Sequence, residues 1–141
     1  MKEVHILLVE DNEGDIVLTL DAFEESKIKT RISVVKNGAD ALDFLFKRGD
    51  YMEEDRPDLI LLDINIPVYN GHDVLKKIKG DSSLRTIPVI MLTTSASQND
   101  INKAYENYSN SYVTKPIDMN DFLKAILKIE QFWLQLSKLA K

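Results

Sequence analysis

The stretch "LILLDINIPVYNG", residues 59–71, decides the fold. Its first four residues, Leu59 to Leu62, are apolar, which is typical of a strand that is covered on both faces of a parallel sheet. Asp63 follows directly. A carboxylate at the end of a buried strand is unfavourable unless a neighbouring group compensates its charge. The stretch therefore predicts a buried parallel strand with a charged partner near its end.

Four other apolar runs resemble strands, and helical patterns separate them. The runs are "VHILLV" (4–9), "RISVV" (31–35), "PVIMLT" (88–93) and "SYVTK" (111–115). The helical patterns cover residues 15–26, 38–47, 71–80, 98–108 and, as the longest, about 118–139. Five strand–helix repeats without a linker predict a single α/β domain over residues 1–141 with a parallel sheet.

The composition narrows the class of protein. The net charge of -5 on 141 residues argues against a surface for nucleic acid, and the absence of cysteine excludes disulfides, cysteine-ligated zinc and thiol catalysis. No stretch approaches the roughly 18 apolar residues of a membrane span, and because the apolar run near the N-terminus is short we expect no signal peptide. We expect a cytoplasmic protein that binds neither nucleic acid nor membrane.

Polar side chains suited to metal binding or catalysis follow four of the five predicted strands. They are Glu10 and Asp11 after the first strand, Asp63 after the third, Thr93 at the end of the fourth and Lys115 at the end of the fifth. Ligands of open α/β sheets bind beyond the carboxyl ends of the strands. In a flavodoxin-like (βα)5 three-layer sandwich with strand order 2-1-3-4-5, these four ends are neighbours.

Three carboxylates that converge at one edge need a cation, or their pKa values rise. Hard oxygen ligands without histidine or cysteine suit Mg2+, which keeps several waters and accepts a phosphate oxygen. Lys115 adds a positive charge for a phosphoryl oxygen, and Thr93 adds a hydroxyl donor. A carboxylate in such a site can itself be the nucleophile and form an acyl phosphate.

Four motifs resemble those of receiver domains of two-component response regulators, in the same order and over about the whole chain. They are "VEDN" (9–12), "LLDINIPVYNG" (61–71), "MLTTS" (91–95) and "SYVTKP" (111–116). The segment "VEDNEGDIVLTLDAF" (9–23), the loop 47–57 and "FWL" (132–134) are similar to a narrower group. These are the single-domain receivers that serve bacterial, cyanobacterial-type phytochrome histidine kinases.

The resemblance implies a role for each site residue. Asp63 is the expected phosphoacceptor and binds Mg2+ together with Asp11 and the backbone carbonyl of Asn65. Glu10 holds the ion through water. Lys115 pairs with the phosphoryl oxygens, and the Lys115–Pro116 bond is expected to be cis. Asp11 and Asp63 as simple caps of a helix and a strand are the alternatives that the residues alone leave open.

The resemblance also implies a switch. Thr93 is expected to turn its hydroxyl to the phosphoryl group, and the ring of Tyr112 follows it inward. Two positions depart from the common pattern. Glu10 stands where many receivers have aspartate, and Thr94 stands where a smaller residue is common.

The C-terminal helix predicts a partner surface. Phe122, Ile126, Ile129 and Trp133 form one apolar stripe that is expected to pack on the sheet. Residues on other faces of the helix need a second partner. We expect a homodimer through Phe132, Trp133, Leu134 and Leu136. The alternatives are a helix end that folds back on its own domain, or docking on the kinase or a downstream protein.

The function expected from these observations is a signalling module and not an enzyme. A histidine kinase phosphorylates it, slow self-dephosphorylation follows, and it acts on an unknown downstream protein without an output domain of its own. A Mg2+-dependent phosphatase with an aspartate nucleophile is the alternative. Asn65 disfavours it, because that class needs a second aspartate there as general acid. A flavin-binding protein is disfavoured by the acidic "EDNEGD" (10–15).

Overall fold

Five parallel strands form one sheet in the order β2-β1-β3-β4-β5 in the computed structural model, which describes residues 3–140. The strands are β1 (Val4–Val9), β2 (Thr30–Val35), β3 (Leu59–Leu62), β4 (Val89–Thr93) and β5 (Ser111–Thr114). In the register, Leu8 of β1 is opposite Val34 of β2 and Leu61 of β3. The predicted strand order is confirmed.

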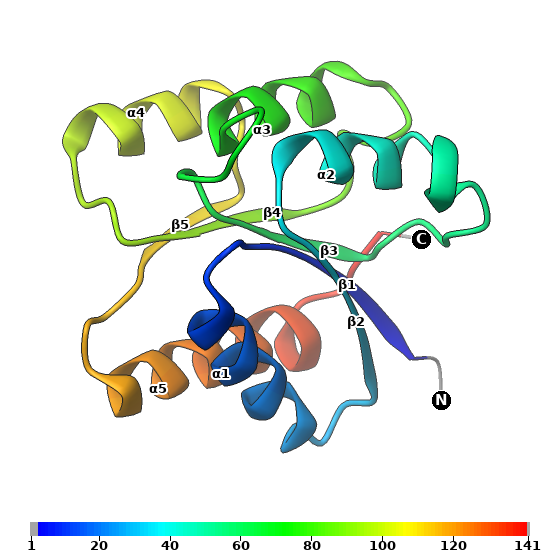
Figure 1. Ribbon diagram of the computed structural model, residues 1–141. Helices are drawn as coiled ribbons and strands as arrows, with labels where there is room; N and C mark the ends of the chain where they lie inside the picture. Colours follow the sequence, from blue (N-terminus) through cyan, green and yellow to red (C-terminus); the bar gives the residue numbers. More distant parts are fainter. Residues whose placement is uncertain (1–2, 141) are drawn as a thin grey trace.

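Five α-helices cover the two faces of the sheet. They are α1 (Glu13–Glu24), α2 (Gly38–Leu45), α3 (Gly71–Gly80), α4 (Gln98–Glu106) and α5 (Met119–Ile129). Figure 1 shows α1 and α5 on one face and α2, α3 and α4 on the other, so the predicted three-layer, flavodoxin-like architecture is confirmed. Within the described part of the chain, no helix has the length and apolar character needed to span a membrane.

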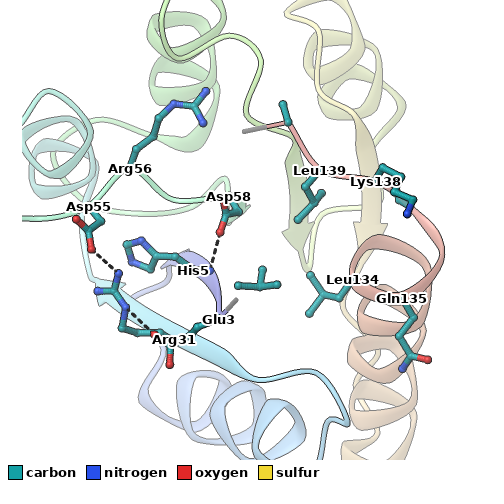
Figure 2. A pocket seen from close by; sticks show the side chains of 13 residues that line it. Glu3, His5, Arg31, Asp55, Arg56, Asp58, Leu134, Gln135, Lys138 and Leu139 are labelled. Atoms are coloured by element: carbon teal, nitrogen blue, oxygen red, sulfur yellow. Dashed lines mark hydrogen bonds and ion pairs between the residues drawn. The ribbon is translucent and has the colours of Figure 1, made fainter. Parts of the chain in front are cut away.

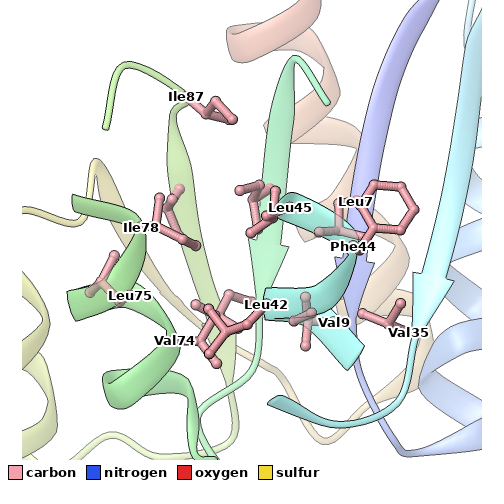
Figure 3. Packing of buried hydrophobic residues seen from close by; sticks show 14 of the residues in the cluster. Leu7, Val9, Val35, Leu42, Phe44, Leu45, Val74, Leu75, Ile78 and Ile87 are labelled. Atoms are coloured by element: carbon pink, nitrogen blue, oxygen red, sulfur yellow. The ribbon is translucent and has the colours of Figure 1, made fainter. Parts of the chain in front are cut away.

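The core lies in two apolar layers, one on each side of the sheet. The central strands β1, β3 and β4 are almost fully buried, because parallel strands have helices on both faces. Figure 3 shows the layer under α2 and α3, to which Leu42 of α2, Leu75 and Ile78 of α3, and Leu7 and Val9 of β1 belong. Each buried side chain of this size contributes about 1.5–3 kcal/mol, so these layers fix the strand ends in place.

The loop between β3 and α3 packs tightly against its neighbours. The Gly38 amide donates to the Pro67 carbonyl at 3.0 Å. A Cβ atom on Gly71 would lie 2.2 Å from the Asp63 carbonyl oxygen, so only glycine fits at that position. Val68 of this loop adopts a backbone φ of 72°, and its side chain is exposed. A β-branched residue in the left-handed region is strained, so this loop stores conformational energy.

The C-terminal helix ends earlier than predicted. After α5 the chain continues as η2 (Glu130–Leu136), a π-helix, and becomes extended at Ser137 and not at residue 139. The buried Glu130 carboxylate accepts hydrogen bonds from Ser26 Oγ at 2.6 Å and from Gln135 Nε2 at 2.8 Å. Residues five apart align in a π-helix, so the Glu130–Gln135 pair fits the wider turn.

The apolar residues beyond α5 divide between core and solvent. Trp133 and Leu134 are half-buried and pack against the apolar layer under α1 and α5, whereas Phe132 stays 54% exposed. The helix end therefore folds partly back on its own domain. The side chain of Leu136 lies outside the described part of the structure.

We predict that Val68→Asn stabilises the protein by about 1 kcal/mol, because asparagine tolerates the left-handed backbone that strains valine. Urea-induced unfolding measures the change. Val68→Thr is the matched control, since threonine keeps the β-branch and therefore the strain. Equal stability of the two variants would contradict the account of this loop.

Candidate functional site

Three carboxylates meet at the carboxyl ends of β1 and β3. Carboxylate oxygens of Glu10, Asp11 and Asp63 lie within 4.8 Å of one another. Glu10 and Asp63 are buried, and Asp11 is exposed. The sheet holds them there, because the Asp63 amide donates to the Val9 carbonyl at 3.1 Å. The predicted convergence of these residues is thus present.

Asp11 is not a helix cap. The N-cap of α1 is Asn12, whose Oδ1 accepts a hydrogen bond from the Asp15 amide at 2.9 Å. The capping interpretation of Asp11 is therefore wrong, because its neighbour fills that role. The Asp11 carboxylate remains available to an ion beside Glu10 and Asp63.

Lys115 supplies the positive charge of the site. Its side chain is 3% exposed, and its Nζ donates to Asp63 Oδ2 at 3.1 Å, to Asp15 Oδ2 at 3.0 Å and to Glu10 Oε1. The sequence predicts Lys115 near the other two carboxylates, but the contact with Asp15 was not predicted. The available signal was that Asp15 lies in the first turn of α1, only four residues after Asp11.

A second set of hydrogen bonds holds the loop between β4 and α4. Tyr112 OH donates to the Ser95 carbonyl at 2.8 Å, and the Ser95 amide lies 3.4 Å from Thr93 Oγ1. Ser95 Oγ donates to Asp100 Oδ2 at 2.5 Å, and Asp100 Oδ1 accepts from His72 Nε2 at 2.9 Å. Thr93 is fully buried and Tyr112 is half-buried. Thr93 and Tyr112, the two residues expected to move on phosphorylation, therefore both lie against Ser95 of this loop.

The oxygen donors fit a hard divalent cation. Glu10, Asp11, Asp15 and Asp63 carry four negative charges when ionised, whereas Lys115 supplies one positive charge in this cluster. Such an excess favours a cation held by carboxylates and water. Asn65 is exposed in the β3–α3 loop, two residues after Asp63.

The comparisons with known proteins decide the family. The model of the response regulator receiver domain matches residues 6–127. The chain belongs to the response regulator receiver domain family.

Individual relatives match this receiver domain over nearly its whole length. Response regulator Rcp1 of Synechocystis sp. (strain ATCC 27184 / PCC 6803 / Kazusa) is 40% identical over 92% of this chain and 88% of its own length. The crystal structure of the phosphorylated cyanobacterial phytochrome response regulator RcpA has a TM-score of 0.97 and 38% identity, covering 99% of this chain and 100% of that one. The Mn2+-bound form of Rcp1 has a TM-score of 0.96 and 38% identity, covering 98% and 99%.

The proline that follows Lys115 differs from the expectation. The structure shows no cis peptide bond over residues 3–140, so the Lys115–Pro116 bond is trans and the predicted cis bond is wrong. The two isomers of a bond to proline differ by only about 0.5–1 kcal/mol, so the local sequence does not decide between them. Lys115 still reaches the site, because its amide donates to the Thr93 carbonyl at 2.6 Å.

A cavity of about 640 Å³ lies at the opposite end of the sheet of the receiver domain. Figure 2 shows His5, Arg31 and Asp58 on one side of it and Leu134 and Leu139 on the other. His5 and Arg31 belong to the starts of β1 and β2, whereas the carboxylate cluster follows the strand ends. The cavity is therefore separate from the candidate site.

Burial and the contact between Glu10 and Lys115 together set the pKa values of these two groups. Burial raises the pKa of the Glu10 carboxyl to about 7, although the hydrogen bond from Lys115 opposes the shift. Burial by itself lowers the pKa of the Lys115 ammonium, but the hydrogen bond to Glu10 and the charge of Asp63 outweigh it. The net pKa of Lys115 therefore lies above its ordinary value, and the ammonium stays charged.

We predict that the affinity for Mg2+ rises between pH 6 and pH 8. Below a pKa of about 7 the Glu10 carboxyl holds a proton that must leave when a cation binds, so affinity grows as that proton is lost. Calorimetric titration with Mg2+ at several pH values measures the change. Glu10→Gln removes the titrating group, and a slope as steep in this variant as in the wild type would contradict the assignment.

Proposed function

We propose that Asp63 accepts a phosphoryl group from a sensor histidine kinase in a Mg2+-dependent reaction, and that the product switches a protein-interaction surface. One observation carries the proposal: the buried Asp63 carboxylate lies beside the Glu10 and Asp11 carboxylates and accepts a hydrogen bond from the Lys115 ammonium. A buried carboxylate beside a cation site and an ammonium is placed to attack phosphorus.

The remaining residues of the site would bind the cation or the phosphoryl oxygens and so neutralise their charges. Asp11, Asp63 and the Asn65 carbonyl would hold Mg2+, and Glu10 would hold it through water. When bound, the ion neutralises charge on the phosphoryl oxygens. Lys115 would donate to a phosphoryl oxygen in place of the Asp63 oxygen that it contacts now. The side chain of Asn65 is an amide, so no acid stands two residues after Asp63 to speed hydrolysis as in the aspartate phosphatases.

Thr93 and Tyr112 would couple phosphorylation of Asp63 to a conformational change at the protein surface. Thr93 Oγ1 is buried at the end of β4 and would turn to a phosphoryl oxygen. Because the Ser95 amide lies 3.4 Å from Thr93 Oγ1 and the Ser95 carbonyl accepts from Tyr112, movement of Thr93 would shift the loop and its contact with the ring. Phosphorylation would act by favouring one of two arrangements of this loop.

A phytochrome-type histidine kinase is the proposed donor. The relatives support this partner, since RcpA is described as a cyanobacterial phytochrome response regulator and matches this chain over its full length. The receiver domain would be a cytoplasmic phosphoacceptor that loses its phosphoryl group slowly, and its target would be a downstream protein.

The first experiment is intact-mass analysis after incubation with acetyl phosphate and Mg2+. We expect a phosphoryl adduct on the wild type that is absent from Asp63→Asn and absent without Mg2+. Asp73→Asn is the matched control, because this aspartate is exposed on α3, outside the cluster. An adduct that persists in Asp63→Asn would overturn the assignment of the phosphoacceptor.

We also propose a homodimer through the C-terminal helix, in which Phe132 makes the main contact beside Trp133 and Leu134. Leu136 is the further residue that the helical sequence pattern assigns to this surface. Phe132 is 54% exposed, and its ring meets that of Trp133 edge-on with 5.3 Å between the centroids. The two rings form one apolar surface at the end of the domain, and such surfaces mark protein contacts. A second copy is the commonest partner for a self-complementary patch.

We predict that Phe132→Ala raises the dimer dissociation constant by roughly tenfold or more, because an exposed aromatic at the centre of an interface carries much of the binding energy. Sedimentation velocity over a concentration series measures it. Tyr105→Ala is the matched control, since Tyr105 on α4 is 50% exposed. A wild-type protein that remains monomeric at tens of micromolar would refute the dimer.

A further inference from the structure

Lys115 has three N–H donors, and a carboxylate accepts from each of them. Two of these carboxylates, Glu10 and Asp63, belong to the proposed phosphorylation chemistry. The third, Asp15, has no part in it. We propose that Asp15 is a positioning residue that holds the Lys115 ammonium beside the phosphoryl group during transfer. This inference rests on the proposed function and deepens it.

The partners of Lys115 change as the reaction proceeds. An Asp63 oxygen attacks phosphorus, a new P–O bond forms, and the bond from phosphorus to the donor breaks; with acetyl phosphate, acetate leaves. The Asp63 carboxylate thereby becomes an acyl phosphate and no longer offers Lys115 the ion pair that it offers before transfer. Glu10 is engaged elsewhere as well, because its Oε2 accepts from the Asp11 and Asn12 amides and it faces the cation site. Asp15 is neither the reacting carboxylate nor one of the three carboxylates that face the cation site, so transfer and cation binding leave its contact with Lys115 in place.

Asp15 is itself fixed by the first turn of α1. Its amide donates to Asn12 Oδ1 at 2.9 Å, and its carbonyl accepts from Thr19 Oγ1 at 2.7 Å. A carboxylate in the first turn of a helix is favoured by the partial positive charge of the helix N-terminus. Its side chain is 26% exposed, whereas that of Lys115 is 3% exposed. Asp15 therefore offers a rigid anchor at the rim of the site to the end of a flexible lysine chain.

The anchor links segments that are far apart in the sequence. Asp15 and Lys115 are separated by 100 residues and lie on α1 and after β5. Without the contact to Asp15, the flexible side chain of Lys115 would let its ammonium move toward whichever neighbouring charge attracts it most strongly. A bound cation shares the Glu10 and Asp63 carboxylates with Lys115, so the loss of Asp15 would matter most when the site is loaded.

A matched control lies on the same helical turn. Glu13 is also acidic and close to the start of α1, but it pairs with Lys36 at the surface. Asp15→Ala and Glu13→Ala each remove one negative charge from the same turn, and only Asp15→Ala removes a partner of Lys115. A change in rate that both variants share is due to the loss of a negative charge from this turn. A change in rate seen only in Asp15→Ala is due to the loss of the contact that positions Lys115.

The first test is the rate of phosphorylation by acetyl phosphate at saturating Mg2+, followed by intact mass. We expect Asp15→Ala to react at least tenfold more slowly than the wild type, Asp15→Asn to lie between the two because its amide oxygen still accepts a hydrogen bond, and Glu13→Ala to stay within twofold of the wild type. Because Mg2+ is saturating, the difference in rate between Asp15→Ala and Glu13→Ala should persist whatever change each variant makes to the Mg2+ dissociation constant. Equal rates in these two variants, or a defect of Asp15→Ala that comes only from weaker Mg2+ binding, would overturn the proposal.

The second test needs neither metal nor phosphoryl donor. The Lys115 ammonium, when held by three carboxylates, should exchange its protons slowly enough for a 15Nζ signal in nuclear magnetic resonance spectra of the metal-free protein, identified by its loss in Lys115→Met. We expect the signal to broaden beyond detection in Asp15→Ala and to remain in Glu13→Ala. Retention in both variants would overturn the anchor. If the wild type itself takes no phosphoryl group, the proposed function fails, whereas the signal still decides whether Asp15 holds Lys115.

Discussion

The buried ammonium of Lys115 is the constraint on which the rest of the site depends. Its carboxylate partners Glu10, Asp15 and Asp63 come from the end of β1, from α1 and from the end of β3. One charge therefore ties three elements together at the edge of the sheet. Removal of one member of a buried charge cluster leaves the others uncompensated, so every side chain here constrains its neighbours.

The apolar layers make this concentration of charge possible. The strands β1, β3 and β4 are buried on both faces, so their ends cannot shift without disturbing the packing of α2 and α3 on one side and of α1 and α5 on the other. Carboxylates that would repel one another are thereby held within 4.8 Å. In the proposed reaction, a cation and a phosphoryl group would meet carboxylates and an ammonium that are already close together, and such preorganisation is the usual source of electrostatic catalysis.

The sequence was sufficient for the strands and for the residues at their ends, because parallel strands of one sheet end at the same edge. It was insufficient for features that depend on contacts formed only in the folded protein. Asp15 was missed because it lies in the first turn of α1 and not at the end of a strand, and only the folded structure brings it to Lys115. The bond before Pro116 was predicted wrongly, since its isomers are close in energy. The helix was predicted to reach residue 139 but ends at Leu136, after Glu130 pairs with Gln135 in a π-helix.

The stability of Lys115→Met, compared with the wild type at pH 8 with and without Mg2+, tests the central claim most directly. In the wild type at that pH Glu10 is largely ionised, and its hydrogen bond from Lys115 lowers its pKa. Loss of the ammonium leaves the buried Glu10 and Asp63 carboxyls either charged without a counter-charge or forced to take up a proton. We expect a loss of about 3–5 kcal/mol in urea-induced unfolding without Mg2+. Saturating Mg2+ should shrink that difference by at least half, because the cation replaces the missing charge. A variant as stable as the wild type without Mg2+, or an equal loss in both conditions, would contradict the account.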